Sequence, residues 1–225
     1  MKMKKNKSME KKNIEVNKDY WDKFYQSNFK HTPSQFCVCV LTEIPDDAVI
    51  VELGSGNGRD SLYFASQGHV TVALDLSHEA IESCKKESKK RDVEHATFVQ
   101  ADLTSIEDVS TAISSARDKA EDNTVIFYSR FVMHSLDDNQ EQAILNTLST
   151  CMQKDELIYF EFRSKEDELL DKHFGGHYRR YVDTDVFYQR LTDLGYQIEY
   201  NHIGQGMAKY KEEDPFVVRI IAKKQ

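Results

Sequence analysis

The chain has 225 residues, a net charge of -8, 40% hydrophobic and 30% charged residues, and a mean hydropathy of -0.62. These values are typical of a soluble globular protein, and apolar runs such as 48–53 are far too short to span a membrane as a helix. The negative charge disfavours a general nucleic-acid binder, which normally presents a basic face. The chain is long enough for one domain, and it offers no Pro- or Ser-rich linker to a second.

Residues 1–12 carry six Lys against one Glu, and no apolar core of the kind found in signal peptides follows them. We therefore expect a flexible basic tail over 1–12 and a single domain over 13–225. The four cysteines lack the spacing of a metal knuckle, so we expect no metal site, reduced thiols and a cytoplasmic location. The sequence does not decide between a monomer and a homodimer.

Aromatic residues recur at helical spacing near the start of that domain, among them Tyr20, Trp21 and Tyr25. They predict one helix, and a second helix is expected after Pro33, so that residues 13–45 form an N-terminal pair. The aromatic helix is a candidate lid over the binding site, in which case its three aromatic residues would contact the substrate. Packing of Trp21 on the core is the alternative.

From residue 48 onward, short β-branched runs alternate with segments of helical periodicity. This alternation predicts a parallel sheet with helices on both faces, because parallel strands need crossover connections. We expect an α/β, Rossmann-like doubly wound sheet, mostly parallel, with an antiparallel edge strand where the last two strands pair directly. The predicted strands are 48–53, 70–75, 96–102, 124–129, 156–162, 196–203 and 216–222, and the predicted helices are 79–90, 107–120, 139–152 and 184–194.

The most specific motif is the run ELGSGNGRD (52–60), directly after the first predicted strand. Three alternate glycines permit a tight turn and let a ligand approach the backbone where a Cβ would collide with it. Asp75 ends the next predicted strand, where a carboxylate can accept hydrogen bonds from both hydroxyls of a ribose. The motif therefore predicts a site for a nucleoside-containing cofactor.

Two classes of cofactor share this geometry. Dinucleotide sites prefer Gly-x-Gly-x-x-Gly, whose pyrophosphate rests on the first amides of a helix, but Arg59 stands where that third glycine would be. Glu52 suits a cationic group, such as the amino group of a methionyl moiety, and would repel a pyrophosphate. The loop thus favours a methyl donor, and a nicotinamide-dependent oxidoreductase is kept as an alternative.

The segment ELGSGNGRDSLYFASQGHVTVALDLS (52–77) resembles the first two cofactor motifs of the class I S-adenosylmethionine-dependent methyltransferases. Within it, GNGRDSLYFA is similar to small-molecule methyltransferases of the tellurite-resistance type, and the segment also resembles enzymes encoded near bacterial surface-polysaccharide genes. The resemblance covers 48–162 and implies S-adenosylmethionine as the cofactor. It is specific for the cofactor and says little about the substrate.

By this resemblance, the glycine loop would line the methionine part of the cofactor and Asp75 would hold the ribose. Leu76 would flank the adenine, and Asp102 would accept a hydrogen bond from the adenine amino group. The loop residues implied in methionine binding are Glu52, Gly54 and Gly56, and the further candidate contacts are Ser55, Asn57, Arg59, Asp60, Leu103 and Ser129.

Open α/β folds bind ligands at the carboxyl ends of their strands, and the resemblance implies that residues after the fourth predicted strand face the transferred methyl group. The catalytic candidates are accordingly Tyr128, Arg130 and His134. His134 titrates near neutrality, so it is a candidate general base. A role in capping the next helix or in packing on the cofactor is an equal alternative for His134.

The run HFGGHYRRY (173–181) gathers basic and aromatic residues within an expected substrate loop, 164–182. Arginine binds carboxylate and phosphate oxygens in bidentate fashion, so we interpret the run as an anion clamp. The alternative is a solvated stretch whose arginines pair with acidic helices. For the arginine at 163, the alternative is an ion pair between neighbouring strands. The substrate-binding candidates of this region are Arg163, His177, Arg179, Arg180 and Tyr181.

Together these patterns predict an enzyme that methylates an oxygen, or less readily a nitrogen, of a small anionic acceptor such as a phosphorylated or carboxylated sugar. A regulatory protein that binds S-adenosylmethionine without catalysis is the alternative from another class, since a fold alone does not guarantee activity. Methylation of nucleic acid or protein is disfavoured, because the chain shows no added recognition domain and no Asn/Asp-Pro-Pro-Tyr/Phe signature.

Overall fold

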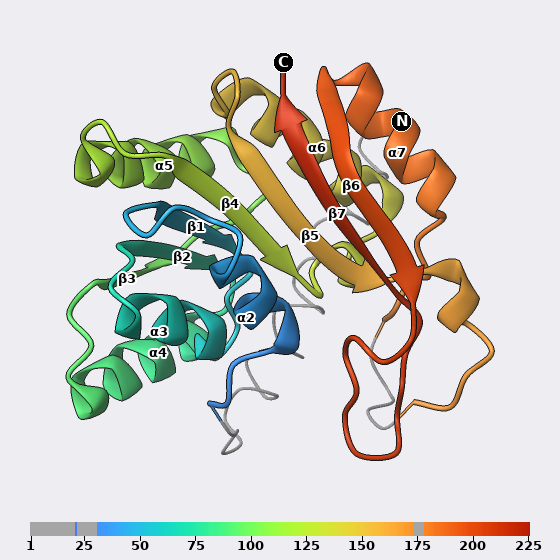
Figure 1. Ribbon diagram of the computed structural model, residues 1–225, viewed down its shortest axis with the longest axis horizontal. Coiled ribbons are helices and arrows are strands. Elements are labelled where there is room, and N and C mark those ends of the chain that lie inside the picture. Colours follow the sequence, from blue (N-terminus) through green and yellow to red (C-terminus); the bar gives the residue numbers. More distant parts are fainter. Residues whose placement is uncertain (1–20, 22–30, 173–177) are drawn as a thin grey trace, which may run out of the picture.

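A computed structural model describes Trp21, residues 31–172 and residues 178–225. The strands of this part form one seven-stranded sheet in the order β3-β2-β1-β4-β5-β7-β6 (Figure 1). The strands are β1 Val49–Leu53, β2 Thr71–Asp75, β3 Ala96–Gln100, β4 Val125–Arg130, β5 Leu157–Arg163, β6 Tyr196–Gly204 and β7 Val217–Lys224. Each observed strand lies within two residues of a predicted one.

The first five strands are parallel, and β7 is antiparallel to both of its neighbours, β5 and β6. The predicted mostly parallel, doubly wound sheet with an antiparallel pair at one edge is confirmed. The outermost strand is β6, which runs in the same direction as β5, while the antiparallel strand β7 lies between them. The chain passes from β5 through α7 to the outer strand β6 and then returns as β7 between β6 and β5.

Helices cover both faces of the sheet, as predicted. The helices α2, α3 and α4 pack on one face and α5, α6 and α7 on the other (Figure 1). Their bounds are α2 Gln35–Leu41, α3 Arg59–Ser66, α4 His78–Arg91, α5 Ile106–Ala120, α6 Asp138–Cys151 and α7 Thr184–Asp193, with short 3-10 turns η1 Met133–Ser135 and η2 Lys165–Asp167.

The strand β1 shows why these central strands are apolar along their whole length. Its side chains alternate, so that Val49, Val51 and Leu53 enter the core beneath α5, whereas Ile50 enters the core beneath α2. Glu52 is the one charged residue of the strand and points to the same side as Ile50. A carboxylate is thereby brought to the end of a central strand.

The N-terminal predictions are tested in part. The helix predicted after Pro33 is confirmed as α2, whose N-cap Ser34 accepts a hydrogen bond from the Cys37 amide. The basic tail and the aromatic helix with Tyr20 and Tyr25 lie outside the described residues, apart from Trp21, which is partly buried. In the described part of the chain, none of the helices has the length and apolarity needed to cross a membrane.

Candidate functional site

The glycine loop joins β1 to α3 at the carboxyl edge of the sheet. Gly54, Gly56 and Gly58 have φ angles of 76°, 54° and 70°, a region that residues with a Cβ rarely adopt. A Cβ at Gly54 would lie only 2.3 Å from the Cγ2 atom of Val132, which follows β4. The glycines are therefore required by backbone conformation, and at Gly54 also by the close approach of the segment after β4.

Glu52 is buried directly before this loop. The side chain of Ser61, in α3, donates a hydrogen bond to its carboxylate. Burial raises the pKa of Glu52, and the neighbouring Asp60 carboxylate raises it further. A cationic ligand group beside Glu52 would stabilise the charged carboxylate and offset both effects.

Asp75 lies at the end of β2 and faces the glycine loop. Its Oδ2 atom accepts a hydrogen bond from the Gly56 amide at 2.7 Å, and its Oδ1 atom accepts one from the Ser77 amide at 2.9 Å. Asp75 therefore lies at the strand end that the sequence predicted, beside the glycine loop. Leu76 follows it, partly buried, and its carbonyl oxygen accepts a hydrogen bond from the side chain of Gln100 in the next strand.

The candidates after β3 lie at the neighbouring strand end. The Asp102 carboxylate accepts hydrogen bonds from the amide and the hydroxyl of Thr104, at 2.8 and 2.7 Å, and Leu103 is buried in the core. On the loop itself, Asn57 and Arg59 are partly exposed, and the Arg59 Nε atom lies 3.8 Å from an Asp60 carboxylate oxygen. The contacts of these residues with a cofactor stay predictions.

Two buried hydroxyls in this region have unused hydrogen-bonding capacity. The Oγ atoms of Ser55, in the loop, and Ser129, at the end of β4, have no hydrogen-bond partner within the described part of the chain. Ser129 is paired with Leu53 across the β1–β4 ladder, so both serines lie at the same edge of the sheet. A buried polar group without a partner costs about 1 to 3 kcal/mol, and this pair fits a site that receives a polar ligand.

Asp60 and Tyr128 occupy a buried network instead of an open site. Asp60 accepts hydrogen bonds from the Ser34 amide and hydroxyl, both at 2.7 Å, and from the Tyr128 hydroxyl at 2.8 Å. Tyr128 is fully buried between Phe36 and Phe64, and burial raises its pKa well above the ordinary value. The geometry does not support a cofactor contact at Asp60 or a catalytic role for Tyr128, because both side chains anchor the start of α2.

His134 lies in η1, just after β4, and is 5% exposed. Its Nδ1 atom accepts a hydrogen bond from the Arg163 amide at 3.3 Å. A neutral imidazole that accepts at Nδ1 carries its proton on Nε2, so that Nε2 is a donor. The role of His134 as general base stays a prediction, and the geometry is also compatible with His134 as a hydrogen-bond donor or packing residue.

A row of charged side chains crosses β4, β5 and β7 near their ends at the ligand-binding edge. The carboxylate of Glu161 accepts hydrogen bonds from the Nε atoms of Arg130 at 2.7 Å and Arg219 at 2.8 Å. The three residues are directly paired across the strands. We call Arg130, Glu161 and Arg219 the charged row. Arg219 was missed from the sequence, although a single arginine in the apolar run VVRIIA (217–222) indicates a special position.

Phe131 brings the charged row close to the glycine loop. It is a non-glycine residue with a φ of 60°, a conformation that costs about 1 to 3 kcal/mol and is common at functional sites. The Arg130 guanidinium lies 4.0 Å from the centre of the Phe131 ring. The next residue, Val132, packs against Gly54. The turn after β4 therefore links the charged row to the loop.

Two arginines of the predicted anion clamp are held in ion pairs. Arg163 is bound by the carboxylates of Asp167 and Glu213. Arg180 is bound by Asp138 and Glu141 of α6. Because both guanidinium groups already pair with carboxylates, some of which also bind Arg190 or Lys172, the geometry favours the alternative of pairing with acidic residues.

The remaining clamp candidates stay predictions or fall outside the description. Tyr181 lies beneath the Lys172 ammonium, which is 5.3 Å from its ring centre. Arg179 lies next to Arg180 in the described segment, and its partly buried side chain has no assigned role. His177 lies outside the described residues.

Fold and site together resemble those of one class of protein. The strand order with its inserted antiparallel β7, the glycine loop after β1 and the carboxylate at the end of β2 are the features of class I S-adenosylmethionine-dependent methyltransferases. The buried Glu52 and the unpartnered serine hydroxyls fit the amino acid end of that cofactor. Comparison with known proteins supports the same class.

Residues 50–155 match the family of methyltransferase domains. An S-adenosylmethionine-dependent methyltransferase from Anabaena variabilis has a similar structure, with a TM-score of 0.71 at 15% identity over 94% of this chain and 95% of that chain. TehB from Haemophilus influenzae is also similar, with a TM-score of 0.61 at 13% identity over 93% of this chain and 67% of that chain.

A curated relative is similar over a shorter stretch. Over 69 residues the chain is 33% identical to an uncharacterized RNA methyltransferase of Protochlamydia amoebophila. The matched stretch covers 31% of this chain and 16% of that relative. The chain thus spans a small part of the length of the curated relative that it matches. The match at residues 50–155 shows similarity to methyltransferase domains over just under half of the chain, and the structural neighbours share the fold of S-adenosylmethionine-dependent methyltransferases.

Proposed function

We propose that the protein transfers a methyl group from S-adenosylmethionine to an oxygen of a small acidic acceptor, with nitrogen as the less favoured acceptor atom. The observation that carries the acidic acceptor is the charged row, in which two arginines share one carboxylate beside the glycine loop. The row places two guanidinium groups in a mostly buried position, and guanidinium groups bind carboxylate and phosphate oxygens.

For the cofactor, we propose that Glu52 binds the methionine ammonium and that Asp75 binds the ribose. The positive-φ glycines let the cofactor approach the backbone, and the hydroxyls of Ser55 and Ser129 gain the partners that they lack in the protein. The adenine would lie beyond β2, beside Leu76, Asp102 and Leu103.

The proposed acceptor needs no general base from the protein. The cofactor supplies a methyl group bonded to a positively charged sulfur. If the acceptor binds as an oxyanion, its lone pair forms the new C–O bond as the C–S bond breaks, and no proton has to be removed. This agrees with the occupied Nδ1 atom of His134 and the buried hydroxyl of Tyr128. Arg130 would pair with the acidic group and keep it ionised.

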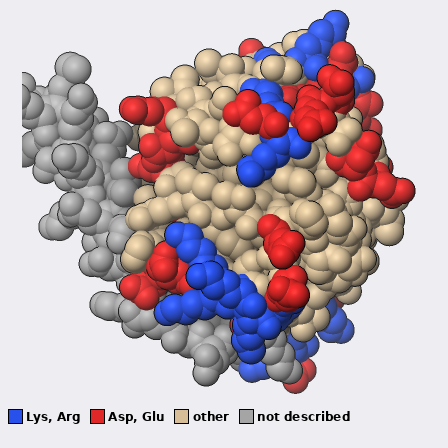
Figure 2. All heavy atoms as spheres, turned by 90° about the vertical axis from the view of Figure 1, so that its left-hand side faces the viewer, with Lys and Arg blue, Asp and Glu red and all other residues tan. Residues whose placement is uncertain are grey.

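The surface charge supports a small acceptor over RNA. Figure 2 views the side of the molecule that carries α4, and basic side chains gather in its lower half. Several of them pair within the helix, because Lys85 binds Glu82, and Lys90 and Arg91 bind Glu87. Lys89, Lys90 and Arg91 also lie in the last turn of α4, where positive charge stabilises a helix.

Calorimetry with S-adenosylmethionine is the first test, followed by measurement of S-adenosylhomocysteine with panels of carboxylic acids, phosphorylated sugars and RNA. We expect micromolar binding of the donor and product formation with a carboxylic or phosphorylated acceptor. Donor binding without turnover on any acceptor would favour the regulatory alternative. Turnover on RNA alone would overturn the small acceptor.

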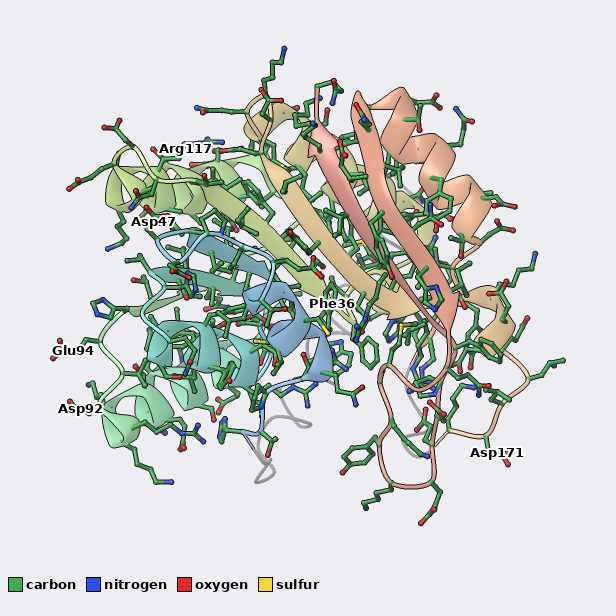
Figure 3. All side chains as sticks on the ribbon, in the orientation of Figure 1. Phe36, Asp47, Asp92, Glu94, Arg117 and Asp171 are labelled. Atoms are coloured by element: carbon green, nitrogen blue, oxygen red, sulfur yellow. The ribbon has the colours of Figure 1, made fainter. Side chains whose placement is uncertain are left out.

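The charged row is tested by Arg130→Gln. We expect the KM for an acidic acceptor to rise at least about tenfold, which corresponds to about 1.4 kcal/mol, with the donor affinity unchanged. The matched control is Arg117→Gln, because Arg117 also binds a glutamate, Glu156, but lies at the opposite end of the sheet (Figure 3). Equal effects of the two substitutions on KM would remove Arg130 from the acceptor site.

A further inference from the structure

We propose that the acceptor is amphipathic, with an apolar body that lies in a groove between α2 and the loop from β6 to β7. This inference rests on the proposed function and narrows its substrate class. It favours carboxylic acids or phosphate esters with an aromatic or branched aliphatic body over the phosphorylated sugars expected from sequence.

The groove has a volume of about 530 Å³, within the range of sites that hold small organic ligands. Its α2 side is lined by Pro33 and Val38, and its opposite side by Met207 of the β6–β7 loop. Val38 is 40% exposed on a helix whose other apolar residues are mostly buried. Pro33, Val38 and Met207 together give the groove an apolar wall, which the apolar body of a ligand could contact.

Arg219 places a positive charge in this groove. Its guanidinium lies 5.1 Å from the centre of the Phe36 ring, and its Nη2 atom donates a hydrogen bond to the Met207 carbonyl at 3.0 Å. The Nη1 atom donates to the Cys39 sulfur at 3.4 Å. Arg219 is therefore fixed by β7, α2 and the β6–β7 loop together. Because the Glu161 carboxylate is shared with Arg130, a ligand carboxylate or phosphate would give Arg219 a further charged partner.

The groove adjoins the methyl-donor site. Ser34 lines it and is hydrogen bonded to Asp60, in the first turn of α3, directly after the glycine loop. Figure 3 shows Phe36 at the junction of α2 with the sheet, which is where Arg219 meets Arg130 through Glu161. An acceptor could therefore keep its apolar body against α2 while its acidic group lies at the charged row.

The test compares three probes on the protein saturated with S-adenosylhomocysteine: 2-naphthoate, 2-naphthamide and acetate. We expect 2-naphthoate to bind at least about tenfold more tightly than either of the others, because only 2-naphthoate has both an apolar body and a charge. Equal binding of 2-naphthoate and 2-naphthamide would overturn the role of charge. Equal binding of 2-naphthoate and acetate would overturn the role of the apolar body.

Two variants locate the binding to the groove. Val38→Asp adds a negative charge among the apolar residues and is expected to weaken 2-naphthoate binding at least about tenfold. The matched control is Val186→Asp on α7, because Val186 is 47% exposed and does not line the groove. Arg219→Gln should abolish the preference for 2-naphthoate over 2-naphthamide. Unchanged affinity in Val38→Asp, or an unchanged preference in Arg219→Gln, would overturn the proposal.

The same experiments separate this inference from the proposed function. If calorimetry detects S-adenosylmethionine and S-adenosylhomocysteine but the probes do not distinguish the variants, the amphipathic acceptor fails and methyl transfer stands. If neither cofactor form binds, the proposed function itself fails.

Discussion

Glu52 is an acidic residue with nearly complete burial, and this makes its contribution to stability depend on pH. Since its folded-state pKa lies above the ordinary value of 4.5, the folded protein binds more protons than the unfolded chain between these pKa values. The contribution of Glu52 to the free energy of unfolding therefore falls as pH rises from 4.5 through the raised pKa. Ionisation of Glu52 in the folded protein is therefore unfavourable unless a cation lies beside the carboxylate.

We predict that Glu52→Gln stabilises the cofactor-free protein by about 1 to 3 kcal/mol near pH 8, with a smaller gain near pH 5. The same substitution should weaken S-adenosylmethionine binding by about 10- to 100-fold, because a charge-assisted hydrogen bond is lost. Urea unfolding at both pH values and calorimetry measure these effects. Glu94→Gln, at an exposed position, is the control, and a gain that does not change with pH would contradict the assignment.

Gly54 tests the close approach between the cofactor loop and the turn after β4. Gly54→Ala must adopt a φ of 76° and place its Cβ against Val132, so we predict a loss of stability above the roughly 1 to 2 kcal/mol of the backbone term alone. Gly206→Ala shares the unfavourable φ, at 82°, with nothing within 4 Å of the added Cβ. The free energy of unfolding measured in urea should be lower for Gly54→Ala than for Gly206→Ala. Adding Val132→Ala should restore part of the stability that Gly54→Ala loses. Equal losses would show that the contact with Val132 is unimportant.

The sequence predicted residues whose roles depend on local conformation, and it failed for those whose partners are distant. The glycines and Asp75 belong to a short motif with fixed spacing, so the loop and the carboxylate beside it could be located. Arg163 and Arg180, in contrast, bind Glu213 and Glu141, which are 50 and 39 residues away. No local pattern indicates such pairs, and an arginine close to other basic residues is easily mistaken for a free anion-binding group.

At the scale of elements, the segment around Arg180 is held by α6 and α7 together. Arg180 and Arg190 both bind Glu141, which is 1% exposed, and the Arg180 amide donates a hydrogen bond to the His134 carbonyl at 2.8 Å. The ion pairs join three parts of the chain on one side of the sheet. Their role is accordingly structural, and it sets the position of the turn after β4.

We predict that Arg180→Ala lowers the free energy of unfolding by about 1 to 3 kcal/mol, since a buried carboxylate loses one of its partners. Donor affinity should be unchanged. Arg91→Ala is the control, because it breaks a more exposed pair with Glu87 and such pairs contribute little. Urea unfolding and calorimetry provide the measurements. If Arg180→Ala is as stable as the unsubstituted protein but has a raised KM for acidic acceptors, Arg180 binds the acceptor and the anion clamp is supported.

Helices and strands were predictable because their patterns are local, but the placing of the last strand was not. Each parallel strand is bounded by glycine, proline or polar residues and followed by a helical repeat, which determines the crossover. The final pair has no such helix, and both β6 and β7 read as ordinary amphipathic strands. Only the tertiary contacts of β7 with β5 decide that β7, and not β6, lies inside the sheet.

At the scale of the whole molecule, cofactor binding should stabilise the folded state by mass action. At 100 times the dissociation constant, S-adenosylmethionine is expected to add about 2.7 kcal/mol, which raises Tm by roughly 5 to 10 °C for a chain of this size. Reduced nicotinamide dinucleotide should produce no shift, because Glu52 repels a pyrophosphate. Differential scanning fluorimetry with both ligands is the measurement, and a shift with the dinucleotide alone would favour an oxidoreductase.

The inner position of β7 has a consequence for synthesis on the ribosome. Strand β5 emerges long before residues 217–224, so one side of β5 has no backbone partner while β6 and the loop after it are being translated. An open strand edge of this kind readily pairs with other chains. Nascent chains stalled at residue 216 should therefore be far more sensitive to protease than chains that include β7, and this half of the sheet would close only after translation has passed that strand.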